Sequence, residues 1–370
     1  MRFIVNSNLL SKSIQQVARV TPSRSTMPIL NNILFVLNDN NLTLRTTDIE
    51  ITYALNIEVT GEEDGSIAIP VRILQDITTE LPDADITLES DGSKINISST
   101  VGNYKINGHQ ASEFPGLPEI GDASTININA DIFKRMIDKT INFVSKDELK
   151  PALLGVYFEF TPDFFRAVAT DGHKLIKFTN ENVKTNGESL KIVIPPKFLG
   201  IVSSLLDKED TIQLLLGTSH VQIVTENASI YSRLIGENYP DYNAVIPTEN
   251  DKNIFINTND LMTSVKRVSI FSNRTTHQIE FNVVPGLLTL SSEDPENNTS
   301  AKEEVLVDYD NAEIVIGYNS IYLRDILKII ETDKVHFKLT NAVGAGLVLP
   351  ETQKDGEVIV LLLMPIRLQR

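Results

Sequence analysis

Three stretches of the chain share one pattern, in which a short apolar strand leads directly into an amphipathic helix. In the first stretch the strand is Phe3–Val5, and Asn8 is the predicted N-cap of the helix. Leu10, Ile14 and Val17 then recur at the helical period, so they share one face of the helix. We expect this face to pack against the rest of a folded domain.

The same pattern returns twice further along the chain. Strand Thr125–Ile128 precedes a helix from Asp131. Strand Ile254–Ile256 precedes a helix from Asp260, so that the three predicted helix starts are 123 and 129 residues apart. This period is the size of a domain rather than of a solenoid repeat. Two further sets of residues recur at nearly the same spacing. Each copy has one member of the set Thr47, Thr170 and Ser292 at a predicted hairpin, and one member of the set Ile69, Ile194 and Ile316 before its second helix.

Each copy continues with strands, a second helix and further strands. Two of the predicted strands begin at Pro28 and Leu153, and the segments Phe114–Pro118 and Asn238–Tyr242 have the composition of linkers. The predicted second helices are Val71–Leu81, a helix after Pro196 that ends near Asp207, and Ser320–Ile330. We therefore predict an α+β fold of three repeated domains, at residues 1–122, 123–247 and 248–370.

Charge is distributed unevenly along the chain. The 33 basic and 49 acidic residues give a net charge of −16, which by itself argues against a phosphate-rich partner. The helical period nevertheless places a recurring set of cations away from the apolar faces of the three helices: Lys12, Arg19, Lys134, Arg135, Lys139, Lys266 and Arg267. These side chains are either simply solvated or contact a polyanion. Their recurrence in three copies favours a sequence-independent contact with a nucleic-acid backbone.

The composition also indicates the cellular compartment of the protein. The chain has no cysteine, which excludes a disulfide framework, a thiolate nucleophile and a zinc finger. The first ten residues lack the apolar run of a signal peptide. The longest apolar run, Val358–Met364, is far shorter than the roughly twenty residues that span a bilayer. We expect a cytoplasmic protein.

Catalytic motifs do not stand out. The chain contains no phosphate-binding glycine loop, no His-Glu-x-x-His and no Gly-x-Ser-x-Gly. Asp171, Gly172 and His173 resemble a metal or acid–base pair, but Asp-Gly is also a strong hairpin signal, and we favour a turn. A paired-carboxylate enzyme stays open because acids are plentiful. We predict no cofactor and no metal.

Three motifs in a fixed order carry a resemblance to a known family. They are Ala169–Leu175, Tyr239–Tyr242 and the terminal Met364–Leu368. With them, the whole chain resembles the bacterial replicative sliding clamps, the beta subunits of DNA polymerase III. The resemblance implies a DNA clamp fold that forms a head-to-tail homodimeric ring of six similar domains, with helices lining the hole. It also implies a processivity factor without enzyme activity, which encircles duplex DNA and tethers the replicative polymerase.

The resemblance further implies specific site residues. Arg24, Arg72 and Lys197 match family positions that contact DNA, while Tyr104, Ile270 and Phe271 match positions in the dimer interface. Short peptides of the polymerase, the clamp loader and repair proteins would bind a groove with apolar anchoring pockets. By matching position, the groove comprises Leu153, Thr170, Gly172, His173, Lys174, Leu175, Pro240, Val245, Asn319, Tyr322, Val343, Met364, Pro365, Ile366 and Arg367.

The chain also departs from the family pattern. Pro151 and Ala152 replace a tyrosine pair implicated in DNA contact, and Ala244 and Thr276 replace an arginine and an aromatic residue at the groove edge. Gln369 and Arg370 extend beyond the usual end. Peptide preference and DNA contact in this loop therefore do not carry over from the resemblance. The alternatives are a frayed tail at Met364 and Pro365, and a tandem-domain interaction scaffold that never encloses DNA.

Overall fold

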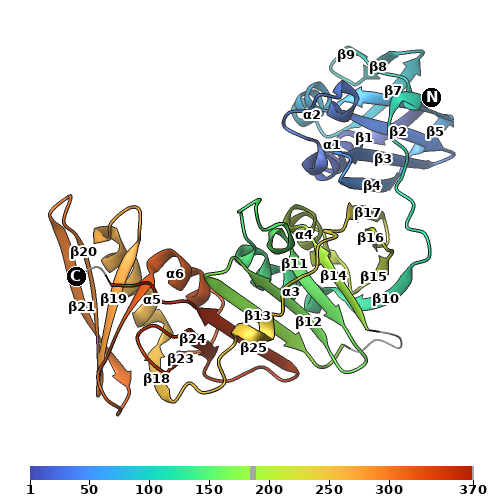
Figure 1. Cartoon of the computed structure of the whole chain (residues 1–370). Coiled ribbons are helices and arrows are strands. Elements are labelled where there is room, and N and C mark those ends of the chain that lie inside the picture. The colour runs from blue at the N-terminus through green and yellow to red at the C-terminus, as the bar shows by residue number, and fades with distance from the viewer. Residues whose placement is uncertain (184–188, 369–370) are drawn as a thin grey trace. The chain divides into compact units, whose positions relative to one another are not determined.

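The computed structural model describes residues 1–183 and 189–368, so Gln369 and Arg370 lie outside the described residues. The chain divides into two compact units. Unit 1 comprises Met1–Lys134 with Lys197–Leu234, and unit 2 comprises Arg135–Pro196 with Ile235–Arg370. Each unit combines antiparallel sheet with helices, which can be followed in Figure 1. The central repeat thus contributes strands to both units.

Unit 1 is built on two antiparallel sheets within the described part of the chain. The smaller has, in order, β5 (Thr60–Glu63), β1 (Arg2–Asn6), β7 (Asp85–Asp91), β8 (Lys94–Ser98) and β9 (Asn103–Asn107). The larger has β10 (Ser124–Asn129), β15 (Thr211–Leu216), β16 (His220–Val224), β17 (Ala228–Arg233), β4 (Ile51–Glu58), β3 (Asn41–Thr47), β2 (Asn32–Asn38) and β6 (Gly65–Pro70). Because β17 pairs with β4, one sheet continues from the first repeat into the central repeat.

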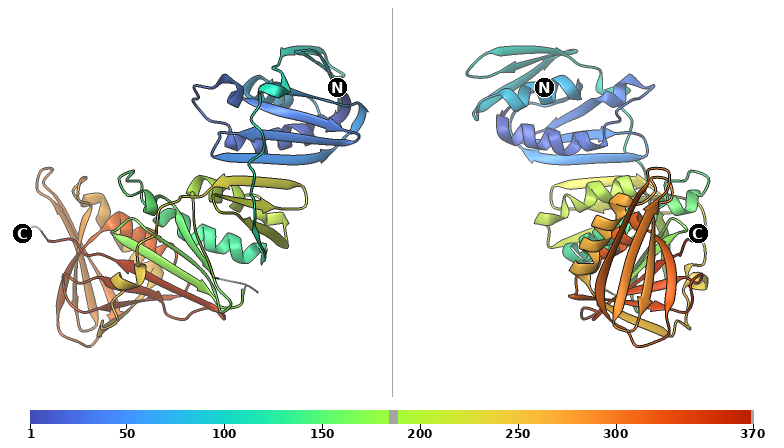
Figure 2. Two further views of the ribbon diagram at one scale, coloured as in Figure 1. Left: turned by 45° about the vertical axis from the view of Figure 1, so that its right-hand side comes forward. Right: turned by 90° about the vertical axis from the view of Figure 1, so that its left-hand side faces the viewer.

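The helices of unit 1 cover the sheets with their apolar faces. Helix α1 (Ser7–Val17) lies beside α2 (Val71–Glu80) and packs against β3 and β4 (Figures 1 and 2). Helix α4 spans Pro196–Ser203. Leu10, Ile14 and Val17 are fully buried, which confirms the predicted inner face of the first helix.

Unit 2 contains a twelve-stranded sheet among the described residues. Its order is β14 (Leu190–Ile194), β11 (Val156–Phe160), β12 (Phe165–Thr170), β13 (Lys174–Asn180), β25 (Glu357–Leu363), β24 (Gly346–Pro350), β23 (Lys334–Leu339), β18 (Lys252–Asn257), β21 (Thr299–Asp308), β20 (Leu287–Asp294), β19 (Gln278–Val284) and β22 (Ile314–Asn319). Strands β13 and β25 pair along their length and join the central repeat to the third. Helix α5 (Thr258–Val268) contacts α6 (Ser320–Leu327), and α3 spans Ala130–Thr140.

The first helix of each repeat is capped by an asparagine that ends the preceding strand. The Asn6 side chain accepts hydrogen bonds from the amides of Asn8 and Leu9, at 3.0 and 3.2 Å, so the prediction of Asn8 as the cap is wrong. Asn129 accepts from the Ile132 amide, and Asn257 from the Asp260 amide. Each cap satisfies amides that have no partner within the helix. The three helices begin in the same way.

Two predicted strands start later than expected, and both corrections have one cause. Pro28–Asn31 and Pro151–Leu154 form 3-10 helices, so the strands begin only at Asn32 and Val156. Proline fixes φ and has no amide donor, which suits the first turn of a helix better than a sheet ladder. The short strand β5 was not predicted, nor were the strands β6, β14 and β22 that precede the second helices.

Candidate partner groove and nucleic-acid interface

The β12–β13 hairpin positions the first group of predicted groove residues. Gly172 has a φ of +92°, a conformation that favours glycine, and its amide donates to the Thr170 hydroxyl at 3.0 Å. Asp171 accepts from the amides of His173 and Lys174 at 2.8 and 2.9 Å. The predicted hairpin turn is therefore confirmed, and it fixes the backbone at His173.

Two other segments of unit 2 meet this hairpin. The His173 ring stacks on Tyr322 with 5.5 Å between ring centroids, and the Met364 amide donates to the His173 carbonyl at 2.8 Å. Asn319 caps α6 by accepting from the Ile321 and Tyr322 amides. Burial, followed by the nearby carboxylates of Asp171 and Asp325, raises the pKa of Tyr322. The structure thus brings His173, Tyr322 and Met364 together.

The C-terminal segment is held as an extra sheet pairing. The Ile366 amide donates to the Gly317 carbonyl at 2.8 Å, and the two residues form an isolated antiparallel bridge. A Cβ at Gly317 would lie 2.7 Å from the Ile366 carbonyl oxygen, so this close approach requires glycine. Pro365 is half-buried and Arg367 is exposed. The described part of this segment is docked on β22 rather than frayed.

Two predicted groove residues are buried in unit 2. Leu175 lies in an apolar cluster with Tyr242 and Leu362. The Lys174 ammonium group forms an ion pair with Asp325 at 2.5 Å and also donates to the Asn142 carbonyl at 3.0 Å. Its charge is therefore engaged inside the protein, and neither side chain offers an exposed surface for a peptide.

The linker between the second and third repeats is anchored by two tyrosines. Tyr239 stacks on Tyr157 with 4.9 Å between centroids, and the Tyr242 hydroxyl donates to Glu159 at 3.0 Å. Pro240 and Val245, which flank these anchors, are exposed.

The remaining predicted groove residues and the departures differ in exposure. Val343 is exposed in a turn where its amide donates to Asn341, and Leu153 is half-buried. Among the departures, Pro151 and Ala244 are exposed, and Thr276 is half-buried.

A pocket of about 650 Å³ lies beside the His173–Tyr322 stack. Its lining also includes Asp325, Lys328 and residues of the segment 141–150, among them Lys146 and Lys150. Lys150 and Lys328 each form an ion pair with a neighbouring aspartate. The stack is therefore accessible to solvent on this side.

Most predicted DNA-contacting cations of unit 1 are exposed. Lys12, Arg19, Arg24 and Arg72 all lie at the surface. Arg19 also donates to the Ser204 hydroxyl, and Lys197 pairs with Asp48. Lys134 is half-buried and lies 3.6 Å from Asp207. Lys12, Arg24 and Arg72 thus lie at the surface of unit 1, whereas Lys134 and Lys197 are engaged with aspartates.

The cations of α3 in unit 2 are placed differently, and here the predicted outer face is wrong. Arg135 donates in a bidentate manner to Glu331 and binds both carboxylate oxygens of Glu357, at 2.8 to 3.0 Å. The Lys139 side chain is only 8% exposed and binds Glu331 and the Ile329 carbonyl, each at 2.8 Å. Residues of the third repeat cover the helix face that lies outside the core of its own repeat.

The pKa shifts of this cluster follow from its contacts. Hydrogen bonds from Arg135, then from Lys139 and Lys354, hold the pKa of Glu331 well below its usual range despite partial burial. Burial lowers the pKa of Lys139, and Glu331 opposes that shift. The cluster is therefore a paired structural network rather than a free basic surface.

Arg267 of α5 is paired as well. Its guanidinium group makes a bidentate contact with Glu303 at 2.6 and 2.7 Å, whereas the neighbouring Lys266 is exposed. Hydrogen bonds from Arg267 lower the pKa of the Glu303 carboxyl. Of the two cations predicted on this helix, Lys266 is the less engaged.

The predicted interface residues lie near sheet edges. Tyr104 is on β9, the last strand of the smaller sheet of unit 1. Ile270 and Phe271 follow α5, and the Ile270 side chain is 77% exposed. Strand β21 pairs with β18 only at Val307 and Asp308, so residues 299–306 form a second free edge within the described chain. Leu306 on this edge is 81% exposed, a feature that the sequence pattern did not reveal.

Comparison with known proteins agrees with this geometry. Family models of the N-terminal, central and C-terminal domains of the DNA polymerase III beta subunit match residues 1–118, 127–241 and 243–367. A sliding clamp structure from Bartonella birtlesii, bound to griselimycin, is 30% identical over all of both chains, with a TM-score of 0.94. The chain belongs to the bacterial beta sliding clamp family. The resemblance and the three-repeat clamp fold are thereby confirmed.

Other sliding clamps are similar over the same span. The beta sliding clamp of Pseudomonas putida is 29% identical over the full length of both chains. The C. crescentus beta sliding clamp is 27% identical over all of both chains, with a TM-score of 0.94, and its structure holds polyethylene glycol at a putative beta-motif tethering region. Membership of the sliding clamp family supports a processivity-factor role and does not favour the scaffold alternative. Among the described residues, no helix combines the length and apolar character needed to cross a membrane.

Proposed function

We propose that this sliding clamp is a non-catalytic processivity subunit that encircles duplex DNA as a homodimeric ring in the cytoplasm. The observation that carries the proposal is the end-to-end match of three repeats to DNA polymerase sliding clamps. We propose that the repeats are bounded as the sequence suggests, at residues 1–122, 123–247 and 248–370. Two copies then supply the six domains of one ring.

Complementary sheet edges support head-to-tail closure. Edge β9 of one copy has Lys105 on it and Lys94 on the strand beside it. The free edge of β21 carries Glu304, together with Lys302 and with Glu303, which Arg267 engages. Pairing the two edges would satisfy backbone groups that are otherwise open and would bury exposed apolar side chains. Val101, Ile270, Phe271 and Leu306 are the exposed apolar side chains concerned, and the half-buried Tyr104 would be covered with them. Two different patches in contact form a closed ring when the rotation divides a full turn.

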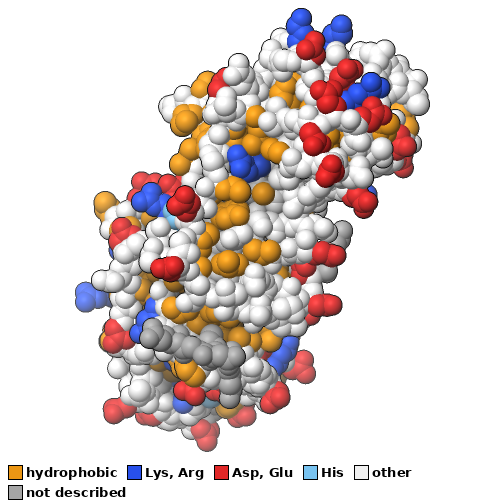
Figure 3. Space-filling view, turned by 90° about the vertical axis from the view of Figure 1, so that its right-hand side faces the viewer, with side chains coloured by type: hydrophobic (Ala, Val, Ile, Leu, Met, Phe, Trp, Pro, Cys, Tyr) orange, Lys and Arg blue, Asp and Glu red, His pale blue; other side chains and the backbone are white. Residues whose placement is uncertain are grey.

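We assign DNA contact to the cations that the structure leaves accessible. The proposed set is Lys12, Arg19, Arg24, Arg72, Lys197 and Lys266, with Lys134 and Arg267 as weaker members. Arg135 and Lys139 are left out because Glu331 and Glu357 engage them. Acidic side chains are spread over the face seen in Figure 3, and they would discourage DNA from binding elsewhere. Weak cationic contacts to phosphate then allow sliding.

We place the partner groove around the His173–Tyr322 stack and Met364. Val245 and Val343, which the resemblance assigns to the groove, are exposed and would offer anchoring contacts for hydrophobic residues of a partner peptide. The named tethering region of the C. crescentus clamp supports such a groove. Its expected ligands are short linear segments of the replicative polymerase, the clamp loader and repair proteins.

Topological binding tests the proposal directly. The clamp is loaded onto a nicked circular plasmid with a clamp loader and ATP, and free protein is removed by gel filtration. Cutting the circle once should release the clamp, because a ring slides off a free end. Retention on the linear plasmid, or a monomeric mass in light scattering, would contradict a dimeric ring.

A further inference from the structure

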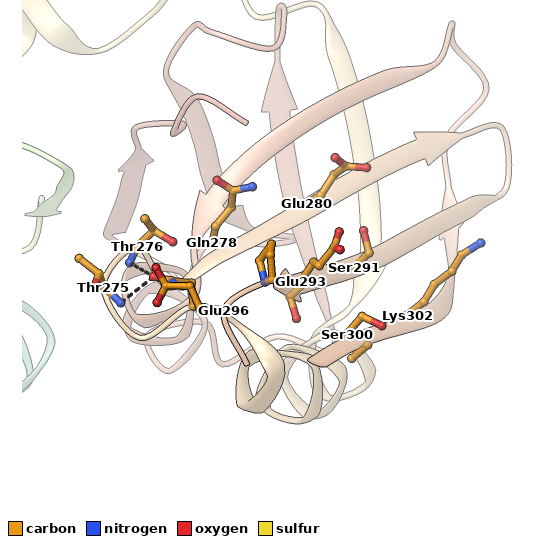
Figure 4. Close-up of a pocket in the computed structure, with 13 residues that line it drawn as sticks. Thr275, Thr276, Gln278, Glu280, Ser291, Glu293, Glu296, Ser300 and Lys302 are labelled. Carbon is orange, nitrogen blue, oxygen red and sulfur yellow. Dashed lines mark hydrogen bonds between the residues drawn. The ribbon is translucent and has the colours of Figure 1, made fainter. Parts of the chain in front are cut away.

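The third repeat carries a polar hollow on the outer face of its sheet. Its volume is about 880 Å³, and its walls come from β19, β20, β21 and the turns at 273–276 and 294–297. Figure 4 shows Glu280, Ser291 and Glu293 side by side on this face, with Glu296 near Thr275 and Thr276 at one end and Lys302 at the other. Its size is that of an ordinary ligand pocket, but its lining is polar.

Strand pairing places the hollow on the solvent side of the sheet. Glu280 lies opposite Ser291, and Ser291 lies opposite Lys302, so these side chains form one row across three strands. The alternate residues Ile279, Phe281 and Leu290 are buried. Neighbours in such a row lie within reach of one ligand.

The two turns at one end of the hollow are hydrogen-bonded to each other. The side chain of Asn273 accepts from the amides of Thr275 and Thr276 and donates to Asp294. Asp294 also accepts from Asn297 at 2.7 Å, and these hydrogen bonds lower the pKa of its carboxyl. The wall is therefore preformed in the folded chain.

The hollow adjoins the proposed partner groove. Gln278, which lines the hollow, is the sheet partner of the groove residue Asn319. The Asn319 side-chain amide also donates to the carbonyl of Thr276, another lining residue, at 3.1 Å. A peptide that lies in the groove beside Asn319 therefore reaches the hollow with its next residues.

The charge of the hollow selects among possible occupants. Glu280, Glu293 and Glu296 have no ion-pair partner among the described residues, and Lys302 is the one cation in the lining. This excess of negative charge repels phosphate, and since only Pro295 and Ala301 of the lining residues are apolar, a hydrophobic side chain finds few apolar side chains to contact. A long basic side chain of a partner would instead find these three carboxylates within the hollow.

From this geometry we propose that the hollow receives a lysine- or arginine-rich flank of the same peptide that occupies the groove. The inference rests on the proposed groove and adds partner selection to it. Partners with a basic flank would bind more tightly than partners with a neutral one, because rim charges act mainly through long-range complementarity.

A peptide series tests this inference on the full-length protein. The probe is the pentapeptide Ser-Leu-Ser-Leu-Phe, whose leucine and phenylalanine side chains supply the hydrophobic contacts that the proposed groove calls for. It is used alone or with Lys-Arg-Lys or Gln-Gln-Gln at either end, and Kd is measured by calorimetry in 50 mM and 300 mM NaCl. At low salt one of the two basic extensions should tighten binding about 3- to 10-fold over its glutamine counterpart. The gain should shrink at 300 mM because salt screens exposed charges.

Two variants separate the hollow from general surface charge. Glu280→Gln combined with Glu293→Gln should abolish the gain and leave the Kd of the plain pentapeptide unchanged. Glu313→Gln, which removes an exposed acid of the same repeat outside the hollow, should preserve the gain. A gain that survives the double variant, or no gain from either extension, would overturn the inference. Failure of the plain pentapeptide to bind would instead overturn the groove itself.

Discussion

Helices α1 and α3 begin two equivalent repeats, but their polar faces have different fates. Both follow a strand, both are capped by an asparagine, and both bury an apolar stripe. Lys12 and Arg19 of α1 are exposed, whereas Arg135 and Lys139 of α3 bind Glu331 and Glu357. Equivalent helices can therefore expose their polar face in one repeat and use it for contacts with a neighbouring repeat in the next.

The largest expected effect comes from breaking the α3 network. Arg135→Ala leaves Glu357, only 11% exposed, without its main partner. We expect the free energy of unfolding to fall by about 2–3 kcal/mol, because an uncompensated carboxylate stays largely out of water. Urea denaturation measures the change. The matched change on the other helix, Lys12→Ala, should alter stability by less than about 0.5 kcal/mol, and equal losses from both variants would remove the contrast.

The second prediction concerns DNA binding, which changes on α1 should affect and changes on α3 should not. Lys12→Gln combined with Arg19→Gln should weaken binding to a linear duplex about 10-fold at low salt. It should also reduce the slope of log K against log[salt] by about 2, since each lost phosphate contact removes roughly 0.9. Fluorescence anisotropy across a salt series gives both values. Lys139→Gln, measured where the protein is folded, should leave the slope unchanged; a matching decrease would place Lys139 back among the DNA contacts.

The smallest expected effect is a dependence of stability on pH. The pKa of Glu331 is depressed in the folded state, so its contribution is complete above its ordinary value of 4.5 and is lost as the pH falls below it. Since this side chain is 43% exposed, we expect the stability difference between the native chain and Glu331→Gln to be about 1 kcal/mol at pH 7. The midpoints of urea denaturation of both chains, measured at pH 7, 5, 4 and 3, should show this stability difference shrinking as the pH falls. A constant difference would exclude the ion pairs as its source.

The sequence predicts the inner faces of the helices because burial of an apolar stripe follows from the helical period. Leu10, Ile14 and Val17 are fully buried as the spacing indicates. The period cannot predict what another repeat places on the opposite face, and Lys139 is therefore misassigned. Glu331 lies almost two hundred residues away in sequence, and no local pattern links the two.

A stronger local signal was present for the helix starts. Asn6, Asn129 and Asn257 each end a strand immediately before a helix, and this recurrence would have identified the caps more reliably than the positions chosen. For the candidate groove, the motifs locate the His173 hairpin and Met364, but they do not indicate that Lys174 turns to Asp325. Such burial depends on tertiary packing.

The sheet pairings between repeats have a consequence for how this chain can be divided. Strand β4 bonds to β17, and β13 bonds to β25, so a cut at either repeat boundary would strip a full row of backbone hydrogen bonds from both pieces. A single excised repeat would expose unpaired strand edges, which are prone to aggregation. The three repeats therefore have to be expressed together, even though the sequence pattern divides the chain into thirds.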